Sequence, residues 1–185
     1  MAPKDDFLAS LKKARSYGLG EFLEIVGEMS QVSTRKGTLG RKTKELITLG
    51  MALAKQCKRC INIHTKAAEE LGATKKEIIQ VKKIALFIKA TPRDDKVLWE
   101  SWKDSWRVFS MGKGPIEHYE RELIALGIAL VNQYKEHIVL HTHYALKHGA
   151  TQTQIFEVMP LALLMDGAPA LSQIGHLVEA LEKNS

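Results

Sequence analysis

Apolar residues recur every three to four positions along most of this chain, and no convincing run alternates apolar and polar residues as a half-buried strand does. Helix boundaries are marked as well. Thr74 followed by Glu77 is typical of a capping box, and the glycines of "ELGAT" and "KHGAT" stand where a helix would end. The pattern therefore predicts an all-α protein. The predicted helices cover residues 4–16, 19–32, 41–55, 57–71, 75–89, 94–110, 116–131 and 135–148, with two more near 152–165 and 169–183.

Two stretches of this helical pattern repeat each other. "ELITLGMALAKQCKRCINIHTKAAEELGAT" begins at Glu45 and "ELIALGIALVNQYKEHIVLHTHYALKHGAT" begins at Glu122, so 122 − 45 gives an offset of 77 positions. The two stretches align without a gap, His64 pairs with His141, and about half of all positions are identical. This agreement exceeds what a shared helical composition produces, and it predicts an internal duplication.

The two copies differ at their centre. At the offset of 77, Cys57 corresponds to Tyr134 and Cys60 corresponds to His137. Only the first copy can therefore carry out thiol chemistry.

The clearest internal linker is "MGKGP" at 111–115, where glycines and a proline interrupt the helical pattern. We predict a single all-helical domain over residues 1–185, built as a duplicated helical bundle. Its two repeats would cover approximately 36–110, with the cysteines, and 115–183, without them. A pseudo-twofold axis would relate the repeats.

Composition places the chain among ordinary globular proteins, with 45% apolar and 26% charged residues and a net charge of +6. The basic stretches "RKGTLGRKTKE" and "KKEIIQVKK" carry no interleaved aromatics, so we expect solvated helix faces and no nucleic-acid partner. An acidic partner protein or an anionic substrate stays open. The charged start "MAPKDDFLASLKKARS" is not typical of a signal peptide, and no long apolar run suggests a membrane span. We therefore expect a cytoplasmic protein without a membrane partner.

The only two cysteines stand in "CKRCINIH". In a helix over 57–71, Cys57, Cys60 and His64 share one face with small apolar residues, so they face inward. The opposite face carries Lys58, Arg59, Asn62, Lys66, Glu69 and Glu70. In a cytoplasmic protein, such a close pair is more often redox-active or metal-binding than a structural disulfide.

Three features favour a reactive thiol at this place. The pair lies in the first helical turn, where the positive end of the helix dipole stabilises a thiolate. His64 follows Cys60 by one turn, within reach of its proton. The second thiol can resolve a sulfenate or a mixed disulfide formed on the first.

Glu45 is a candidate fourth member of this site. It precedes "LITLGMALA", which is apolar on nearly every side, and it lies on one stripe with Leu49, Ala52 and Gln56. A carboxylate on that stripe would face the thiols and could take part in a proton relay. The alternative is a solvated first-turn glutamate favoured by the helix dipole. Because Glu122 occupies the same place in the second copy, we prefer the functional interpretation.

Two other interpretations of the cysteines remain open. Cys57, Cys60 and His64 are good zinc ligands, and the second copy offers its own set in Glu122, His137 and His141. A fourth ligand for the first set would come from His118, His137, His141, His143, His148 or His176. Inert packing thiols are the other alternative. No flavin, haem or nicotinamide motif is present, so we expect no metal and no organic cofactor.

Trp99, Trp102 and Trp106 recur at helical spacing on one face of "VLWESWKDSWRVF". We expect this stripe to lie in the core or in a subunit interface. A platform for stacking a substrate is the alternative.

These residues resemble a known family. The order Glu45, Cys57, Cys60 and His64 is similar to the Glu…Cys-x-x-Cys-x-x-x-His pattern of the alkylhydroperoxidase D-like proteins of the carboxymuconolactone decarboxylase superfamily. The surrounding "ELI.LG.ALA" and "H..AA...GAT" segments and the tandem repeat extend the resemblance over roughly residues 40–175. The resemblance implies an all-helical fold and, for a chain with two repeats, a homotrimer.

The resemblance also implies roles. Cys60 would be the peroxidatic nucleophile and Cys57 the resolving thiol. His64 would take the proton, and Glu45 would complete the relay. Arg59 stands where the family often has histidine, and its charge could help to hold a thiolate. The implied activity is that of a thiol-dependent peroxidase or disulfide reductase. Its substrate would be a peroxide or a small disulfide, and an external dithiol or a redox protein would supply the electrons.

The second half resembles the decarboxylase branch of the superfamily, which lacks the CxxC and keeps a histidine at the place of His141. "LLMDGAPALSQI" is similar to a helix–Gly–Pro–helix segment of that branch. One alternative function is therefore a lyase that uses the second repeat, and another is a non-catalytic oligomeric binding protein. We predict that the second repeat is a structural partner in which Glu122 and His141 hydrogen-bond.

Overall fold

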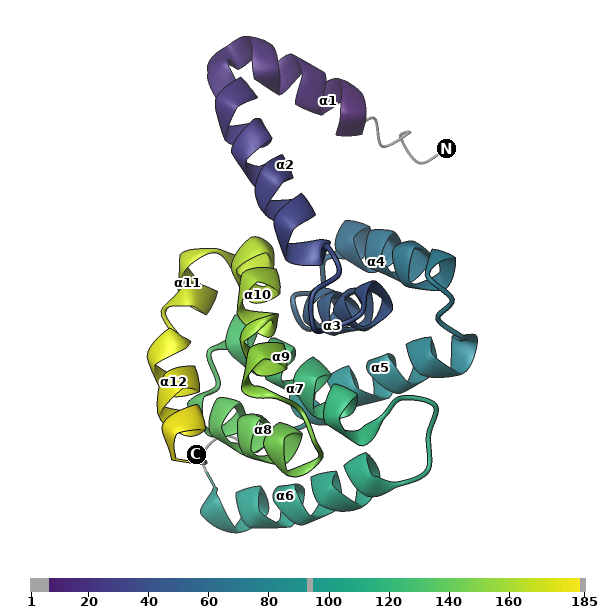
Figure 1. The fold of residues 1–185 in the computed structure, drawn as a ribbon, viewed down its shortest axis with the longest axis vertical. Helices are drawn as coiled ribbons and strands as arrows, with labels where there is room; N and C mark the ends of the chain where they lie inside the picture. Colours follow the sequence, from purple (N-terminus) through teal and green to yellow (C-terminus); the bar gives the residue numbers. More distant parts are fainter. Residues whose placement is uncertain (1–6, 93–94, 184–185) are drawn as a thin grey trace.

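The computed structural model describes residues 7–92 and 95–183, which form helices joined by short loops, with no strand among them (Figure 1). The predicted all-α fold class is confirmed. In chain order the elements are α1 (Phe7–Ala14), the π-helical turn η1 (Arg15–Leu19), α2 (Gly20–Thr34), α3 (Arg41–Ala54), α4 (Lys58–Glu70), α5 (Lys75–Lys89), α6 (Lys96–Met111), α7 (His118–Asn132), α8 (Lys135–Lys147), α9 (Gln152–Phe156), α10 (Val158–Asp166), α11 (Ala168–Leu171) and α12 (Ile174–Glu182). Residues 4–6 and 94 of the predicted helices lie outside the described residues.

The two helices predicted near the C-terminus are each divided. Residues 152–165 form α9 and α10, which part at Glu157. Pro160 accounts for the division, because it has no N–H to donate and its ring collides with the carbonyl four residues earlier in a continuous helix. Residues 169–183 likewise form α11 and α12. Helix periodicity predicted the segments but not these breaks.

No helix in the described parts of the chain combines the length and the apolar character that crossing a bilayer demands.

The core is built on the crossing of α3 and α7, the matching helices of the two repeats. A Cβ on Gly50 would come within 2.8 Å of Ile124, and a Cβ on Gly127 would come within 3.0 Å of Ile47. Gly127 and Ile124 are the 77-position counterparts of Gly50 and Ile47. The contact is therefore self-complementary, as contacts across a twofold axis are. The structure thus has the predicted duplicated, pseudo-twofold arrangement.

Backbone conformations recur at the same offset. Gln56 and Gln133 follow α3 and α7 in the left-handed region, with φ of 54° and 57°. Gly72 and Gly149 follow α4 and α8 with φ of 88° and 96°. Glycine tolerates this conformation, which is why both repeats place it at the end of the helix.

Capping boxes recur too. The hydroxyl of Thr74 accepts the N–H of Glu77, and that of Thr151 accepts the N–H of Gln154. In both boxes the side chain of the third residue accepts the threonine N–H in return. The capping box predicted at Thr74 is confirmed, and it fixes the start of α5.

The loops that lead into α3 and α7 are each held by the opposite repeat. Glu157 accepts the N–H of Thr38 at 2.7 Å and pairs with Nζ of Lys44 at 2.7 Å. Gln80, the counterpart of Glu157, accepts the N–H of Ile116 at 3.1 Å. Burial by itself would raise the pKa of Glu157, but the hydrogen bonds from Lys44 and Thr38 outweigh it and lower the pKa to about 2.

The C-terminal ends of α2 and α6 are anchored alike. Lys44 donates to the carbonyl of Arg35 at 3.0 Å, and its counterpart Arg121 donates to the carbonyl of Gly112 at 2.6 Å. Arg35 and Gly112 are the C-cap residues of α2 and α6. The two helices therefore enter the body in the same way.

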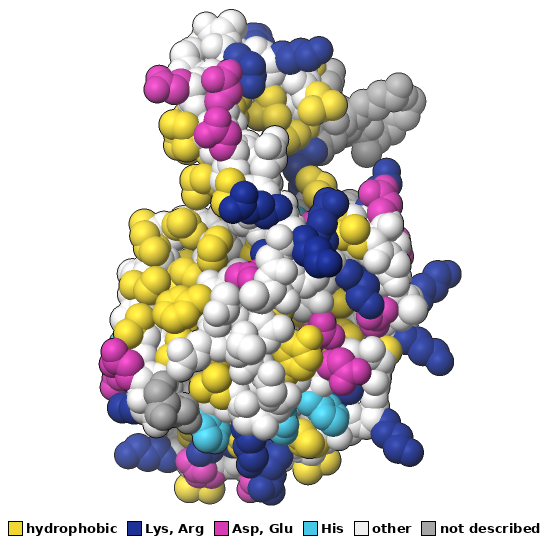
Figure 2. Space-filling model, viewed as in Figure 1, with side chains coloured by type: hydrophobic (Ala, Val, Ile, Leu, Met, Phe, Trp, Pro, Cys, Tyr) yellow, Lys and Arg dark blue, Asp and Glu magenta, His cyan; other side chains and the backbone are white. Residues whose placement is uncertain are grey.

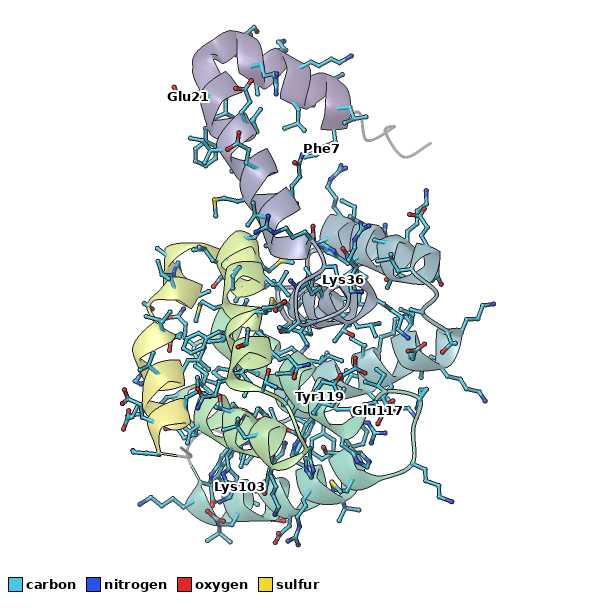
Figure 3. The ribbon with its side chains drawn as sticks, in the orientation of Figure 1. Phe7, Glu21, Lys36, Lys103, Glu117 and Tyr119 are labelled. Carbon is cyan, nitrogen blue, oxygen red and sulfur yellow. A yellow bond between two sulfur atoms is a disulfide. The ribbon has the colours of Figure 1, made fainter. Side chains whose placement is uncertain are left out.

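Beyond this shared end the two helices take different paths. α6 lies along the body beside α5, α7 and α8, whereas α2 rises away from the body and, with η1 and α1, forms an N-terminal arm of residues 7–34 (Figure 1). Figure 3 places Phe7 and Glu21 on this arm and Lys103 on α6, at the opposite end of the molecule. The arm is the main departure from twofold symmetry.

Candidate functional site

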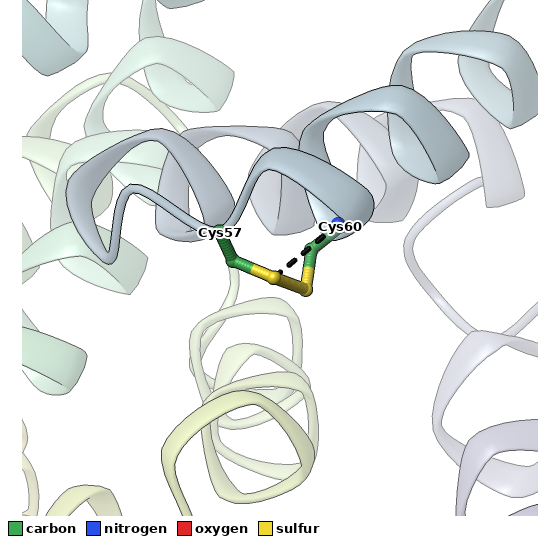
Figure 4. Close-up of a disulfide and its surroundings, with 2 residues drawn as sticks. All are labelled: Cys57 and Cys60. Atoms are coloured by element: carbon green, nitrogen blue, oxygen red, sulfur yellow. Dashed lines mark hydrogen bonds between the residues drawn. A yellow bond between two sulfur atoms is a disulfide. The ribbon is translucent and has the colours of Figure 1, made fainter. Parts of the chain in front are cut away.

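The two cysteines form a disulfide at the start of α4, so the structure shows the oxidised form of the pair (Figure 4). Their Cα atoms are 5.3 Å apart. Cys57 is the N-cap residue of α4, and its Sγ accepts the backbone N–H of Cys60 at 3.3 Å. The pair therefore lies where the helix N-terminus stabilises negative charge on sulfur.

The structure brings Glu45 and His64 together. Oε2 of Glu45 lies 2.8 Å from Nδ1 of His64. α3 presents Glu45 toward α4, and His64 lies one turn after Cys60 on α4. Because a carboxylate only accepts hydrogen bonds, Nδ1–H of His64 donates to Glu45, and Nε2 is the nitrogen that can exchange a proton with another group.

The outer side of this site is open. The side chain of His64 is 19% exposed and that of Glu45 11%. Ile63, which neighbours Cys60 on α4, is 52% exposed. The guanidinium of Arg59 lies over the ring of Phe7 on α1, 4.0 Å from its centre. The disulfide and its histidine thus form a half-open surface, which we call the thiol face and define as Cys57, Cys60, Ile63 and His64.

The matching positions of the second repeat form a closed cluster. Glu122, His137 and His141 are 1%, 2% and 0% exposed. Oε2 of Glu122 lies 2.7 Å from Nδ1 of His141, and Nε2 of His141 lies 3.1 Å from Nδ1 of His137. The predicted hydrogen bond between Glu122 and His141 is therefore present.

α6 covers this closed cluster. Nε1 of Trp106 donates to Glu122 at 3.1 Å, and the hydroxyl of Ser110 donates to the same carboxylate. The ring of Trp102 stands edge-on to that of His137, with centroids 4.7 Å apart. Trp102 and Trp106 are 7% and 0% exposed, so they belong to the core. Placing this stripe in a subunit interface is wrong for these two tryptophans, because the chain itself buries them.

Burial governs the chemistry of His137. It lowers the pKa of His137 to about 2, with a smaller contribution from neighbouring His141. Nε2 of His137 has no hydrogen-bond partner among the described residues. His137 therefore stays neutral at physiological pH, and its surroundings are those of a packed core.

Among the residues that the structure describes, no group of three or more His, Cys, Asp and Glu side chains converges as metal ligands would. In the first set the two sulfurs are joined to each other. In the second set the imidazoles of His137 and His141 hydrogen-bond to each other.

Two clefts open beside Tyr134, the counterpart of Cys57. One of about 460 Å³ includes Gln56 and Lys82 in its lining, and another of about 570 Å³ includes Trp99 and His137. Neither lining contains a cysteine, so these clefts are separate from the thiol face.

Sequence reasoning missed two sets of contacts. Ser110 and Trp106 are partners of Glu122, and their spacing of four residues on one face of α6 was the available signal. The ion pair of Lys44 with Glu157 joins the two repeats. It had no sequence signal, because the partners are far apart in the chain and only the fold brings them together.

Comparisons with known proteins agree with this architecture. The sequence model described as "Carboxymuconolactone decarboxylase family" matches residues 20–98 and again residues 102–180. A protein of Paracoccus denitrificans described as "Uncharacterized protein 4 in cox locus" is 36% identical over 62 residues, which are 34% of this chain and 56% of the relative. The match thus spans little more than half the length of that relative. No solved structure matches the chain.

Proposed function

Because the chain belongs to the carboxymuconolactone decarboxylase family, which includes enzymes, we propose that it is a thiol-dependent peroxidase or disulfide reductase whose working group is the Cys57–Cys60 pair. The observation that carries the proposal is the contact at 2.8 Å between Glu45 on α3 and His64 on α4, the helix whose start holds both sulfurs. A dithiol beside an imidazole–carboxylate pair supplies a nucleophile, a resolving thiol and a proton acceptor.

In the proposed first step, Nε2 of His64 takes the proton of the Cys60 thiol. Glu45 holds the imidazole through Nδ1 and stabilises the imidazolium that forms. Glu45 thereby acts as a positioning residue, and His64 as the general base.

The thiolate of Cys60 then attacks one oxygen of a peroxide. A sulfur–oxygen bond forms, the oxygen–oxygen bond breaks, and the departing alkoxide leaves as an alcohol with the proton held by His64. Cys57 next attacks the sulfur of the Cys60 sulfenic acid, water leaves, and the Cys57–Cys60 disulfide closes. The oxidised pair in the structure corresponds to the state at the end of this half-cycle.

An external dithiol completes the cycle. It supplies two electrons and two protons, through a mixed disulfide, and restores both thiols while becoming a disulfide itself. With a disulfide as substrate in place of a peroxide, Cys60 attacks a sulfur and a thiol leaves. The half-open thiol face is compatible with the approach of a partner molecule to the sulfur atoms.

For the second repeat we propose a structural role. Glu122 accepts hydrogen bonds from Trp106, Ser110 and His141, and the indole rings of α6 fill the space in front of His137. A catalytic lyase site would need a substrate to reach Glu122 and His141, which are at most 1% exposed and do not line the neighbouring cleft that includes Trp99 and His137.

The deciding experiment follows oxidation of the reduced protein by mass spectrometry. Addition of one equivalent of a hydroperoxide should produce a mass loss of two hydrogens, located in the peptide that links Cys57 to Cys60. A panel of dithiols should then restore the reduced mass. Thiols that oxidise no faster than those of an unfolded control peptide would refute the proposal and favour a binding protein.

A labelling experiment tests the roles of the two cysteines. Different groups would stabilise the two thiolates. The N–H of Cys60 donates to the sulfur of Cys57, whereas His64, one turn after Cys60, would take the proton of the Cys60 thiol. We expect limiting iodoacetamide to label Cys60 of the reduced protein first, because only Cys60 has a proton acceptor one turn away. Preferential labelling of Cys57 would reverse the two roles.

A further inference from the structure

The N-terminal arm carries the counterpart of the lid that closes the second repeat. At the offset of 77, α2 corresponds to α6, and each range matched by the family model opens on one of these two helices. Their apolar stripes correspond position by position. Phe22, Ile25, Met29 and Val32 on α2 match Trp99, Trp102, Trp106 and Phe109 on α6. We call the four residues on α2 the arm stripe.

In the second repeat, the stripe of α6 covers a particular face of α8. The rings of Trp102 and Trp106 lie 4.7 Å from His137 and 4.9 Å from His141. The counterparts of these two histidines are Cys60 and His64. The duplication therefore indicates that an apolar helix stripe is the natural cover of the thiol face.

In the part of the chain that the structure describes, the arm stripe is largely exposed and the thiol face is only partly covered. Phe22, Ile25 and Val32 are 59%, 49% and 57% exposed, against 0% for Trp106 on α6. On the thiol face, Ile63 is 52% exposed. Large apolar side chains gathered on one helix face are typical of a contact with another protein surface.

The arm of the same chain is held away from this face. α2 is one unbroken helix whose C-terminal part packs on α10 and whose end is fixed by Lys44. Each further residue toward Gly20 carries the stripe about 1.5 Å along the helix axis, away from the body (Figure 1). At the far end of the arm, Phe7 lies against Arg59, on the outer side of α4.

We propose that the arm stripe packs on the thiol face of a second copy of this chain, so that each site is completed by a neighbouring subunit. Figure 2 shows further hydrophobic side chains on the arm and on the body below it. On the body they include Leu171, Ile174 and Val178, which are 43%, 38% and 36% exposed.

The duplication favours a second copy as the occupant. The stripe that corresponds to the cover of the second repeat is the arm stripe itself, and this chain holds it away from its own thiol face. A second copy presents the same stripe in a form that can reach the face. Because one chain supplies both surfaces, the exchange can close as a symmetric pair or as a ring of three.

Such a contact changes the environment of the thiols. Ile25 and Met29 of the partner subunit would form an apolar wall opposite Cys60 and His64, as their counterparts Trp102 and Trp106 do opposite His137 and His141. Bulk water would be excluded while the Glu45–His64 contact stays inside. The inference does not rest on the proposed chemistry, because it concerns which surfaces touch.

Cross-linking between two distinguishable chains tests the contact. The first chain carries Ile25→Cys with Cys57→Ser and Cys60→Ser, so that its only thiol is on the arm stripe. The second, of different length, carries Cys57→Ser and keeps Cys60 as its only thiol. After co-expression and mild oxidation, we expect a disulfide-linked heterodimer. A matched control places the new thiol at Gln31, on α2 but off the stripe, and should give at least about tenfold less product, because that thiol lacks the effective concentration of a bound neighbour.

The cross-link pattern separates the possible occupants. Equal yields from positions 25 and 31 would overturn the proposal. So would a link that forms only when Ile25→Cys and Cys60 stand on one chain of monomeric mass, since the arm would then cover its own site.

Light scattering and thiol labelling give a second, independent reading. Both measurements use the Cys57→Ser background, in which the unmodified arm should give an oligomeric mass. Phe22→Glu should lower that mass. It should also speed iodoacetamide labelling of Cys60 at least about fivefold, because a more accessible thiol reacts faster. Gln31→Glu should change neither. A monomeric mass at tens of micromolar, or an unchanged labelling rate in Phe22→Glu, would refute the contact whether or not the protein reduces peroxides.

Discussion

The two repeats hold the same pair of side chains in opposite environments. The Glu45–His64 and Glu122–His141 contacts measure 2.8 and 2.7 Å, so the helices position both pairs alike. The first pair has side chains that are 11% and 19% exposed, and the second pair 1% and 0%. The difference comes from the helix that precedes each repeat, since α6 lies on its repeat and α2 leaves it.

This comparison shows how a duplicated scaffold can separate stability from chemistry. In the second repeat, aromatic rings and Ser110 satisfy and cover the carboxylate, which suits a packed core. In the first repeat, two sulfur atoms occupy the places of Tyr134 and His137, and the histidine keeps access to its surroundings. Substitutions in the Glu45–His64 pair should therefore change the reaction rate, and substitutions in the Glu122–His141 pair should change the free energy of unfolding.

The largest expected effect is on rate. His64→Ala should slow peroxide turnover by about 10²–10⁴-fold, the usual cost of losing a general base. Glu45→Gln should lower the rate and move its pH profile, because the amide no longer stabilises an imidazolium. Stopped-flow oxidation of the reduced dithiol between pH 5 and 9 measures both variants.

The matched control is His143→Ala, on the exposed side of α8, which should leave the rate unchanged. If Glu45→Gln has the wild-type rate at every pH, the carboxylate has no part in the proton relay and His64 acts alone.

The largest expected effect on stability is in the second repeat. His141→Ala removes the imidazole partner of a carboxylate that is 1% exposed, and breaking such a buried pair costs about 3–5 kcal/mol. Urea unfolding, together with peroxide turnover per folded molecule, would measure this effect. We expect lower stability with near wild-type turnover.

A second variant keeps this test decisive if His141→Ala does not fold. His141→Gln retains a side-chain donor for Glu122 and should recover part of the stability. Turnover that survives loss of both cysteines and disappears in His141→Gln would show that the second cluster is catalytic after all.

Acid should destabilise the protein first through His137, below about pH 6.5, and additionally through Glu157 below about pH 4.5. The pKa of His137 is about 2 in the folded chain, below its unfolded value near 6.5, so the folded state resists protonation. Stability should fall by about 1.4 kcal/mol per pH unit as the pH drops below about 6.5. Glu157, whose pKa is also lowered to about 2, keeps its contribution above its unfolded pKa near 4.5 and loses it only below that value.

Denaturant titrations from pH 7.5 to 5 isolate the contribution of the histidine. His137→Gln should flatten the slope in this window, while Glu157→Gln should leave it as in the wild type. A wild-type stability that stays constant from pH 7 to 5 would contradict the buried, neutral state of His137.

The smallest predicted effect tests the equivalence of the repeats. Thr74→Ala and Thr151→Ala each remove one N-cap acceptor, and each should lower the free energy of unfolding by about 1 kcal/mol. Serine at either position, which restores the acceptor, is the control. Thermal or urea unfolding measures the loss of stability in each variant. A loss at only one of the two sites would show that the two caps do not contribute equally to stability.

The sequence by itself determined the helices, the duplication and the candidate site residues. Helix periodicity and capping depend on groups within about four residues of one another, so they can be recognised without a fold. Glu45 was therefore correctly placed on an inward-facing helix stripe, whereas the stripe of α4 that carries His64 is only partly buried. The duplication could also be recognised from the sequence, because the glycines that end its helices and the threonines that begin them recur at one offset.

Only the tertiary structure decided which of these groups meet and which stay open. The contact between Glu45 and His64, the pairing of Lys44 with Glu157, and the burial of Trp106 over Glu122 join residues on different helices. Such contacts depend on how whole helix surfaces pack against one another, and no local sequence pattern specifies that packing. The arm shows this most clearly, since α2 and α6 share their apolar stripe and their anchored end but take different paths through space.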